Sequence, residues 1–81
     1  MKYTVYVLRS IRDGKRYVGF TNNLNRRIQE HNKGKVASTR KRVPLKLVRK
    51  EYFKTKQEAQ VREMFLKTGK GRKWLNDNGI K

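Results

Sequence analysis

Residues 17–31 combine hydrophobic positions with side chains that can do chemistry. Their sequence, YVGFTNNLNRRIQEH, begins as a strand and continues as a helix. Counted from the start of that helix, positions i, i+3, i+4 and i+7 fall on one side. They hold Leu24, Arg27, Ile28 and His31. Charged groups rarely sit on an inward stripe without a partner, because their desolvation is costly. We therefore look for a functional site around Arg27 and His31.

Three further side chains complete a candidate polar set: Tyr6, Tyr17 and Glu63. Phosphodiester cleavage needs a base or positioner for water, a cation beside the phosphate and often a divalent metal held by carboxylate oxygen. The phenols or the imidazole could handle protons, Arg27 could face the phosphate, and Glu63 could hold a metal. Because the set contains one carboxylate, a single-metal site is expected rather than a two-metal site.

Each of these residues also has a purely structural interpretation. Tyr6 and Tyr17 could be half-buried strand aromatics, and His31 could be a hydrogen-bonded histidine near a helix C-terminus. Arg27 and Glu63 could form an ion pair that joins two helices without any chemistry. Such an ion pair would explain the two charges, but not why the phenols and the imidazole lie on the same side.

A hairpin is expected to position the two tyrosines. Residues 3–10 (YTVYVLRS) are rich in β-branched and aromatic residues, which is typical of a central strand. Asp13-Gly14 favours a two-residue turn with positive φ, in which Ser10 faces Tyr17 across the ladder. Strand parity then places the two phenols and a glycine on one face, and an apolar set on the other. The first set is Tyr6, Tyr17 and Gly19, and the second is Tyr3, Val5, Val7, Val18 and Phe20.

The remaining pattern predicts three helices and one more strand. Thr21 is the expected N-cap of a helix that runs to about Lys33, with Gly34 as its stop. Residues 45–53 (LKLVRKEYF) predict a third strand, in which Leu45, Leu47 and in part Arg49 share a face. The capping box at residues 55–58 opens a second helix that runs to about residue 68 and stops at Gly69. A short third helix lies within residues 70–81, with Trp74 and Leu75 inward and Asn78-Gly79 at its end.

This order predicts an α+β fold in a single domain, residues 1–81. The sheet is small, three-stranded and antiparallel, and consists of the hairpin and a third strand. Two main helices and a short C-terminal helix pack on it. On the second helix, Ala59, Glu63 and Leu66 occupy one side, so Glu63 lies at the border of the packed face.

The sequence has 23 Lys and Arg against six Asp and Glu, a formal net charge of +17. Such an excess attracts polyanions through counterion release, so nucleic acid is the expected partner and an anionic membrane surface the second. Residues 33–44 form a basic loop that is either a solvated connection or a phosphate-contacting arm. The cations of this loop are Lys33, Lys35, Arg40, Lys41 and Arg42. No cysteine is present, and no segment has the length of a membrane span or the pattern of a signal peptide, so we expect a cytoplasmic protein.

The residues of the candidate set also carry a resemblance to a known family. The segment TVY at residues 4–6 and the segment YVG at residues 17–19 resemble the paired motif of the GIY-YIG nuclease superfamily. Thr and Val replace the first Gly and Ile of that motif. Arg27, ten residues after Tyr17, matches the family's catalytic arginine, and His31 matches as well. The stretch EAQVREMFLK resembles the helix with the family's metal-binding glutamate, which gives that role to Glu63.

The resemblance covers nearly the whole chain. The later LKTGKGRKWL is similar to the ending of small stand-alone bacterial members, which resemble the N-terminal nuclease domain of the UvrC repair protein. An asparagine that many relatives place after the glutamate helix has its counterpart in Asn76 or Asn78.

The resemblance implies an endonuclease that hydrolyses a phosphodiester of DNA with one Mg²⁺ or Mn²⁺ ion. In this picture Tyr6 or Tyr17 activates water with help from His31, and Arg27 stabilises the charge on the phosphate. Glu63 holds the metal. A structure-selective role linked to DNA repair or recombination follows from the same resemblance.

Two other functions are consistent with the sequence. One is a non-catalytic nucleic-acid-binding module that keeps the scaffold and its charge, and the other is a nuclease subunit that needs a protein partner for specificity. RNA is a second candidate substrate, and the sequence gives no indication of the oligomeric state.

Overall fold

The computed structural model describes residues 2–80, so Met1 and Lys81 of the expected domain lie outside the described residues. Three strands form one antiparallel sheet with the order β2-β1-β3. The elements in chain order are β1 (Tyr3–Ser10), β2 (Arg16–Thr21), α1 (Leu24–Asn32), β3 (Leu45–Phe53), α2 (Lys56–Leu66) and α3 (Gly69–Asp77). The expected α+β fold is therefore confirmed, including the bounds of its first and third strands.

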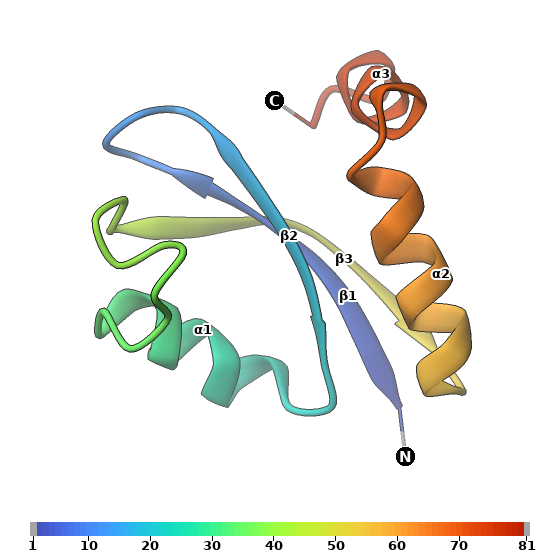
Figure 1. Ribbon diagram of the computed structural model, residues 1–81, viewed down its shortest axis with the longest axis horizontal. Coiled ribbons are helices and arrows are strands. Elements are labelled where there is room, and N and C mark those ends of the chain that lie inside the picture. Colours follow the sequence, from blue (N-terminus) through green and yellow to red (C-terminus); the bar gives the residue numbers. More distant parts are fainter. Residues whose placement is uncertain (1, 81) are drawn as a thin grey trace.

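The sheet lies between two layers of helix, with α1 on one face and α2 and α3 on the other (Figure 1). The parity of β1 sorts the core into two clusters, as the alternation predicts. On the α1 face, Tyr6, Leu8 and Leu45 are buried, and Leu24 and Ile28 of α1 pack against them. The other face buries the valines of β1 and β2 against α2 and α3, through Val5, Val7, Val18, Ala59, Leu66 and Leu75.

The hairpin loop is longer than the expected two-residue turn. Leu8 pairs with Tyr17 and Arg9 with Arg16, so the prediction that Ser10 faces Tyr17 is wrong by two residues. The cause is the Ser10 side chain, whose Oγ accepts from the backbone N–H groups of Arg12 and Asp13 at 3.2 and 3.1 Å and so stabilises a wider loop. A shift of two keeps the parity of the strand, and Tyr6, Tyr17 and Gly19 still share one face.

A register shift lies in the pairing of β1 with β3. Val7 pairs with Arg49, but the next residue, Leu8, pairs with Leu47, so Val48 is the extra residue of a bulge. The prediction that Leu45, Leu47 and Arg49 share a face is therefore wrong beyond residue 47. The bulge turns Arg49 to the α3 side, where its guanidinium lies 4.8 Å from the centre of the Trp74 ring.

Two predicted helix ends also differ from the structure. The N-cap of α1 is Asn23, whose side chain accepts from the Arg26 N–H, and not Thr21 as predicted. Thr21 Oγ1 instead accepts from the backbone N–H of Asn23 in the turn before the helix. Gly69 does not stop α2 but begins α3, with Thr68 as N-cap. The capping box at Thr55 is as predicted, and Gly34, the expected stop, follows the C-cap Lys33 of α1 with a φ of 76°.

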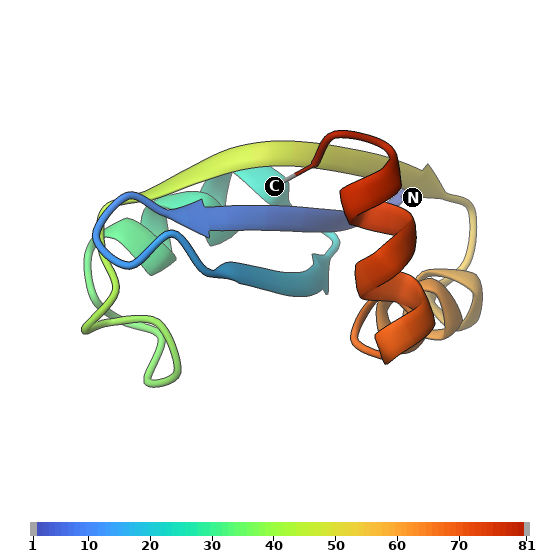
Figure 2. The ribbon, with the colours of Figure 1, turned by 90° about the horizontal axis from the view of Figure 1, so that it is seen from above.

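The corner between α2 and α3 depends on a glycine. Figure 2 shows α3 crossing α2 steeply, and at this corner a Cβ on Gly71 would collide with the backbone of Phe65 and Leu66. The turn brings Trp74 and Leu75 inward, as predicted, and α3 ends with Asn78 as C-cap and Gly79 at a φ of 74°. Within residues 2–80, none of the helices is both long and apolar enough for a membrane span.

Candidate active site

Tyr6, His31 and Thr39 form a buried line of hydrogen-bonding side chains. The Tyr6 hydroxyl lies 3.0 Å from His31 Nε2, and His31 Nδ1 lies 2.7 Å from Thr39 Oγ1. The side chains come from β1, α1 and the loop before β3, and their exposed fractions are 1%, 0% and 0%. Both ring nitrogens of the histidine are therefore held, which fixes the orientation of the ring.

The imidazole of His31 is kept neutral by its surroundings. Burial lowers its pKa, and the positive charge of Arg27 lowers it further, while Glu30 opposes this weakly. A neutral imidazole has one donor and one acceptor nitrogen. Either Nδ1 donates to Thr39 and Nε2 accepts from Tyr6, or Thr39 donates to Nδ1 and Nε2 donates to Tyr6. The first arrangement makes His31 an acceptor for the phenolic proton.

The phenol of Tyr6 lies directly over Gly19 of β2. A Cβ built on Gly19 would stand 2.5 Å from the Tyr6 hydroxyl oxygen and 3.2 Å from Cε2 of Tyr17. A residue without a side chain is therefore needed here so that the phenol can reach His31. Burial raises the pKa of Tyr6, and the nearby Arg27 guanidinium opposes this shift. The phenol consequently keeps its proton unless a base takes it.

Arg27 and Glu63, from different elements, both influence the pKa of Tyr6. The guanidinium of Arg27 lies beside the phenol, where this contact raises the pKa of Arg27, and 36% of its side chain is exposed. The charge of Glu63, on α2, contributes to the raised pKa of Tyr6, after burial and the phenol of Tyr17. The structure pairs Arg27 with Glu30 at 3.2 Å and Glu63 with Lys67 at 3.5 Å. An Arg27–Glu63 ion pair is thus not the reason for the two charges.

Glu63 is the member of the candidate set that could hold a divalent metal through a carboxylate. Its side chain is 16% exposed and one oxygen, Oε2, is shared with Lys67. Among residues 2–80, no group of three or more His, Cys, Asp or Glu side chains could enclose a metal. Mg²⁺ usually keeps several waters and is held by one or two carboxylates together with phosphate oxygens of a substrate. One partly buried carboxylate, such as that of Glu63, fits that pattern.

Tyr17 occupies a different position from Tyr6. Its ring lies edge-on to His31, with ring centroids 5.0 Å apart, and 6.4 Å from the Tyr6 ring. The side chain is half-buried and also lines a cleft beside β2. The structure thus places Tyr6, Tyr17, Arg27 and His31 together, with Tyr6 and His31 buried and Tyr17 and Arg27 nearer the surface. Glu63, on α2, is linked to this group through the effect of its charge on the pKa of Tyr6.

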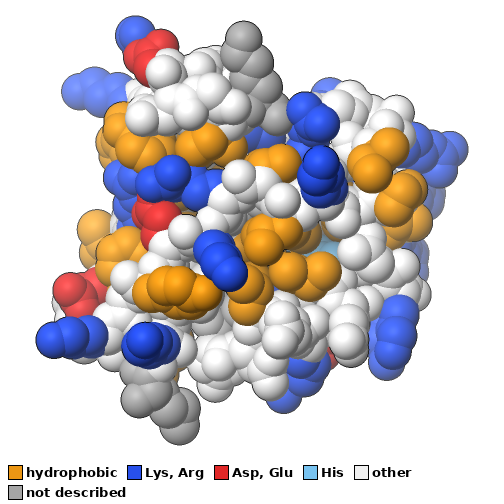
Figure 3. All heavy atoms as spheres, turned by 180° about the vertical axis from the view of Figure 1, so that it is seen from behind, with side chains coloured by type: hydrophobic (Ala, Val, Ile, Leu, Met, Phe, Trp, Pro, Cys, Tyr) orange, Lys and Arg blue, Asp and Glu red, His pale blue; other side chains and the backbone are white. Residues whose placement is uncertain are grey.

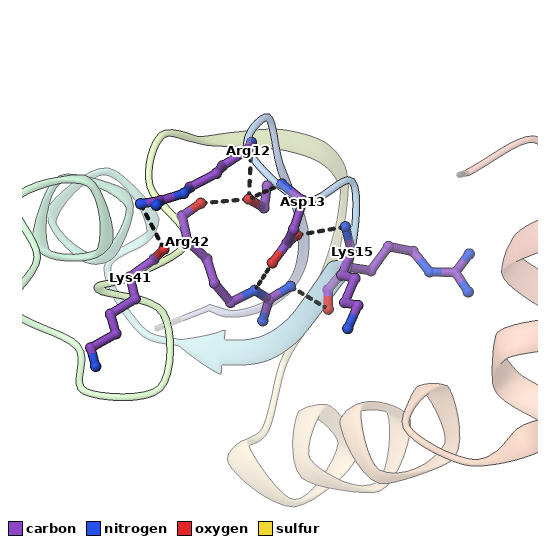
Figure 4. Close-up of polar contacts among 7 residues, drawn as sticks. Arg12, Asp13, Lys15, Lys41 and Arg42 are labelled. Atoms are coloured by element: carbon purple, nitrogen blue, oxygen red, sulfur yellow. Dashed lines mark hydrogen bonds and ion pairs between the residues drawn. The ribbon is translucent and has the colours of Figure 1, made fainter.

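The basic loop before β3 is only partly a free arm. Lys33, Lys35, Arg40 and Lys41 are exposed. Arg42 is instead part of the hairpin contact in Figure 4, where its Nε lies 3.1 Å from Asp13 Oδ2 and its Nη2 donates to the carbonyl oxygen of Arg16. The loop also carries the buried Thr39, so it packs against the site as well as facing solvent.

The two asparagines near the C-terminus make different contacts. Asn78 Nδ2 donates to the carbonyl oxygen of Trp74 at 2.8 Å and so caps α3. Asn76 Oδ1 accepts from Arg16 Nη1 at 2.8 Å, at the cleft beside β2. Sequence reasoning missed Thr39 as a site residue, although a small hydroxyl residue among the cations of a loop was a signal that could have found it.

The fold and the paired tyrosines of this site are those of a GIY-YIG domain. The profile of the GIY-YIG catalytic domain matches residues 2–76. The chain therefore belongs to the GIY-YIG catalytic domain family, a family of nucleases.

Similar proteins occur in species of Bacillus and Clostridium. A UPF0213 protein of Bacillus licheniformis is 51% identical over 63 residues, which cover 76% of this chain and 64% of the relative. A UPF0213 protein of Clostridium perfringens is 50% identical over 64 residues, which cover 78% of this chain and 68% of the relative. The chain thus spans slightly less than two thirds of the first of these proteins.

A solved structure supports the same grouping. The solution NMR structure of a UPF0213 protein from Bacillus halodurans is 36% identical to this chain and superposes with a TM-score of 0.60. The match covers 100% of this chain and 86% of that one.

Proposed function

We propose that this protein is a metal-dependent endonuclease that hydrolyses phosphodiester bonds of DNA at the site around Tyr6. The observation that carries the proposal is the Tyr6–His31 hydrogen bond of 3.0 Å with the Arg27 guanidinium beside the same phenol. A proton acceptor and a phosphate-binding cation thus meet at one oxygen. Membership in a nuclease family supports this interpretation.

In the proposed reaction Tyr6 is the base. A water molecule gives a proton to the phenolic oxygen while the phenolic proton passes to His31 Nε2. The lowered pKa of His31 supports this role, because it keeps the imidazole unprotonated and able to accept. Thr39 holds the tautomer with the proton on Nδ1 and is a positioning residue. The raised pKa of Tyr6 explains why the phenol needs the imidazole, since a buried phenolate would be costly without it.

Arg27 binds the phosphate that is cleaved. It is the half-exposed cation of the site, whereas Tyr6 is 1% exposed, so a phosphate that reaches Arg27 also comes next to the Tyr6 hydroxyl. A guanidinium offers paired donors to phosphate oxygens and stabilises the charge that grows in the transition state. The phosphate would displace Glu30, which is paired with Arg27 at 3.2 Å, from the guanidinium.

Glu63 is the residue that would hold a divalent ion, Mg²⁺ or Mn²⁺. When bound, such an ion supplies charge neutralisation at the phosphate and at the leaving oxygen. Lys67 balances the carboxylate of Glu63 in the metal-free protein.

The finer parts of the proposal rest on the resemblance and the charge. A structure-selective substrate and a role in DNA repair or recombination are proposed from the similarity to the UvrC nuclease domain. A cytoplasmic location is proposed from the sequence alone. A protein partner that supplies specificity is compatible with the short chain. A non-catalytic nucleic-acid-binding module is the second candidate, favoured by the net charge of +17.

The test is cleavage of labelled branched and linear DNA with Mg²⁺, with Mn²⁺ and with chelator. We expect metal-dependent products from the natural sequence and none from Glu63→Ala, with the fold retained by circular dichroism. Asp77→Ala is the matched control, because it also removes the carboxylate of an i,i+4 Lys pair, on α3. A fully active Glu63→Ala protein would contradict the metal role, and binding without products in every condition would favour the binding module.

A further inference from the structure

A cleft lies between the start of β2 and the corner of α2 and α3. Its volume is about 650 Å³, and none of the described residues that line it is acidic. Its cations come from two stretches that are far apart in the sequence, the start of β2 and the corner of α2 and α3. We call it the basic cleft and define it by Lys15, Arg16, Lys67 and Arg72, with Tyr17 and Asn76 between them.

The basic cleft adjoins the candidate active site at two residues. Tyr17 lines the cleft, and its ring contacts His31, with the two ring centroids 5.0 Å apart. Lys67 lines the cleft and places its Nζ 3.5 Å from Glu63 Oε2. A chain that lies in the cleft therefore continues towards the atoms that would carry out the cleavage.

Neighbouring contacts keep the cleft rigid and positive. Arg16 Nη1 donates to Asn76 Oδ1 at 2.8 Å and to the carbonyl oxygen of Ile80 at 2.7 Å, which fixes its guanidinium. Asp13 is next to the cleft in sequence, but its carboxylate is turned to Arg42, as Figure 4 shows. Its negative charge is neutralised there.

Positive charge alone does not single out this cleft. Lys and Arg side chains are spread over the opposite face of the molecule as well, with few acidic ones between them (Figure 3). Three features together distinguish the basic cleft: its concave shape, the lack of acidic residues in its described lining, and its contact with Tyr17 and with the partner of Glu63.

We propose that the basic cleft binds the sugar-phosphate backbone of the nucleic-acid strand that continues from the cleaved phosphate. This inference rests on the proposed function, because the cleft can guide a substrate strand only if the candidate active site next to Tyr17 cleaves nucleic acid. Its cations neutralise phosphates, and Tyr17, a half-buried aromatic residue of the lining, offers an apolar contact to the sugar or base. The cleft, rather than the loop at residues 33–44 alone, then sets the path of the substrate.

The test compares two double variants that lose the same charge. Lys15→Gln with Arg72→Gln alters the cleft, and Lys50→Gln with Lys54→Gln alters exposed cations of β3 and of the residue after it. Binding of a short labelled DNA is measured against salt, with chelator present so that no cleavage occurs. We expect the cleft variant to bind roughly tenfold more weakly or worse, and its salt slope to fall by about 1.8 for a duplex or about 1.4 for a single strand. The β3 variant keeps the natural slope.

Equal losses in the two double variants would overturn the proposal. Because Arg72 lies in the first turn of α3, the single Lys15→Gln variant in the exposed hairpin loop is measured too and should show about half of the slope change. The same comparison with an RNA of the same base sequence shows whether the cleft binds the DNA backbone, the RNA backbone or both. A loss in both supports a contact with the backbone alone, and a loss confined to RNA would assign the cleft to an RNA strand.

The outcome also separates this inference from the proposed function. If the natural protein cleaves DNA and the two double variants bind alike, the cleft proposal fails and the nuclease proposal stands. If only the cleft variant loses affinity and no products form with any metal, the cleft is a site for a nucleic-acid backbone, and the nuclease proposal fails together with the path to a cleaved phosphate.

Discussion

The hydroxyl of Tyr6 and Nε2 of His31 lie 3.0 Å apart, although the two residues are 25 positions apart in the sequence and both are buried. Tyr6 belongs to the central strand and His31 to the helix that covers it, so one hydrogen bond joins the two layers at the candidate site. Buried polar groups need partners, and here each is the partner of the other. The same bond that completes the packing can move a proton.

The two tyrosines are expected to differ in mutational effect. Tyr6→Phe removes the hydroxyl that would receive the proton of water, and the cleavage rate should fall by about 10²- to 10⁴-fold, the usual contribution of a general base. Tyr17→Phe keeps the ring against His31 and should retain most of the rate. Single-turnover cleavage of a labelled DNA measures both. A dead Tyr17→Phe beside an active Tyr6→Phe would transfer the role of base to Tyr17.

Thr39 should affect catalysis through the histidine. Thr39→Val has a similar shape but leaves Nδ1 of His31 without its partner, which should cost about 1–3 kcal/mol of stability and roughly tenfold in rate. Thr39→Ser keeps the hydroxyl and should restore most of the loss. Urea unfolding and the pH profile of cleavage are the measurements. A valine variant with an unchanged pH profile would show that Thr39 only fills space.

The lowered pKa of His31 gives stability a defined pH dependence. In the unfolded chain His31 takes up a proton near pH 6.5, whereas in the folded protein it does so only at lower pH. The unfolded state therefore binds more protons in this window, and the free energy of unfolding falls as the pH falls below about 6.5, by at most about 1.4 kcal/mol per pH unit. The cleavage rate should fall in the same direction, because a protonated imidazole cannot accept from Tyr6.

The pH measurement is specific because His31 is the one histidine of the sequence. Denaturant unfolding between pH 7 and pH 5 is compared for the natural protein and His31→Asn, so that all other groups cancel in the difference. If the two proteins show the same slope, His31 is not held neutral by the fold.

Much of the fold was predictable because hydrophobic periodicity decides which faces are buried. The parity of β1 placed Tyr6 correctly even though the loop at Asp13 was misjudged, since an error of two residues does not exchange the faces of a strand. The bulge at Val48 was not predictable in the same way. It depends on how Arg49 of β3 packs against Trp74 of α3, and no local residue pattern indicates it.

The candidate site was predictable as a set of residues but not as a geometry. Spacing on one helix indicated that Arg27 and His31 face the same way, and spacing on the second helix placed Glu63 at the border of its packed face. The sequence could not show that Arg27 pairs with Glu30, because both lie on α1 and a pairing across helices was equally consistent with the pattern. The contact of Thr39 with His31 depends on how an irregular loop folds back onto α1, which no periodicity encodes.

The most direct test of the central claim is cleavage of labelled DNA by the natural protein and by Arg27→Ala, each with Mg²⁺, with Mn²⁺ and with chelator. The account predicts metal-dependent products whose rate of formation falls by at least about 10²-fold in Arg27→Ala, while binding weakens much less, because the guanidinium acts mainly on charge that develops in the transition state. Equal cleavage by both proteins, or tight binding without products in every condition, would contradict it.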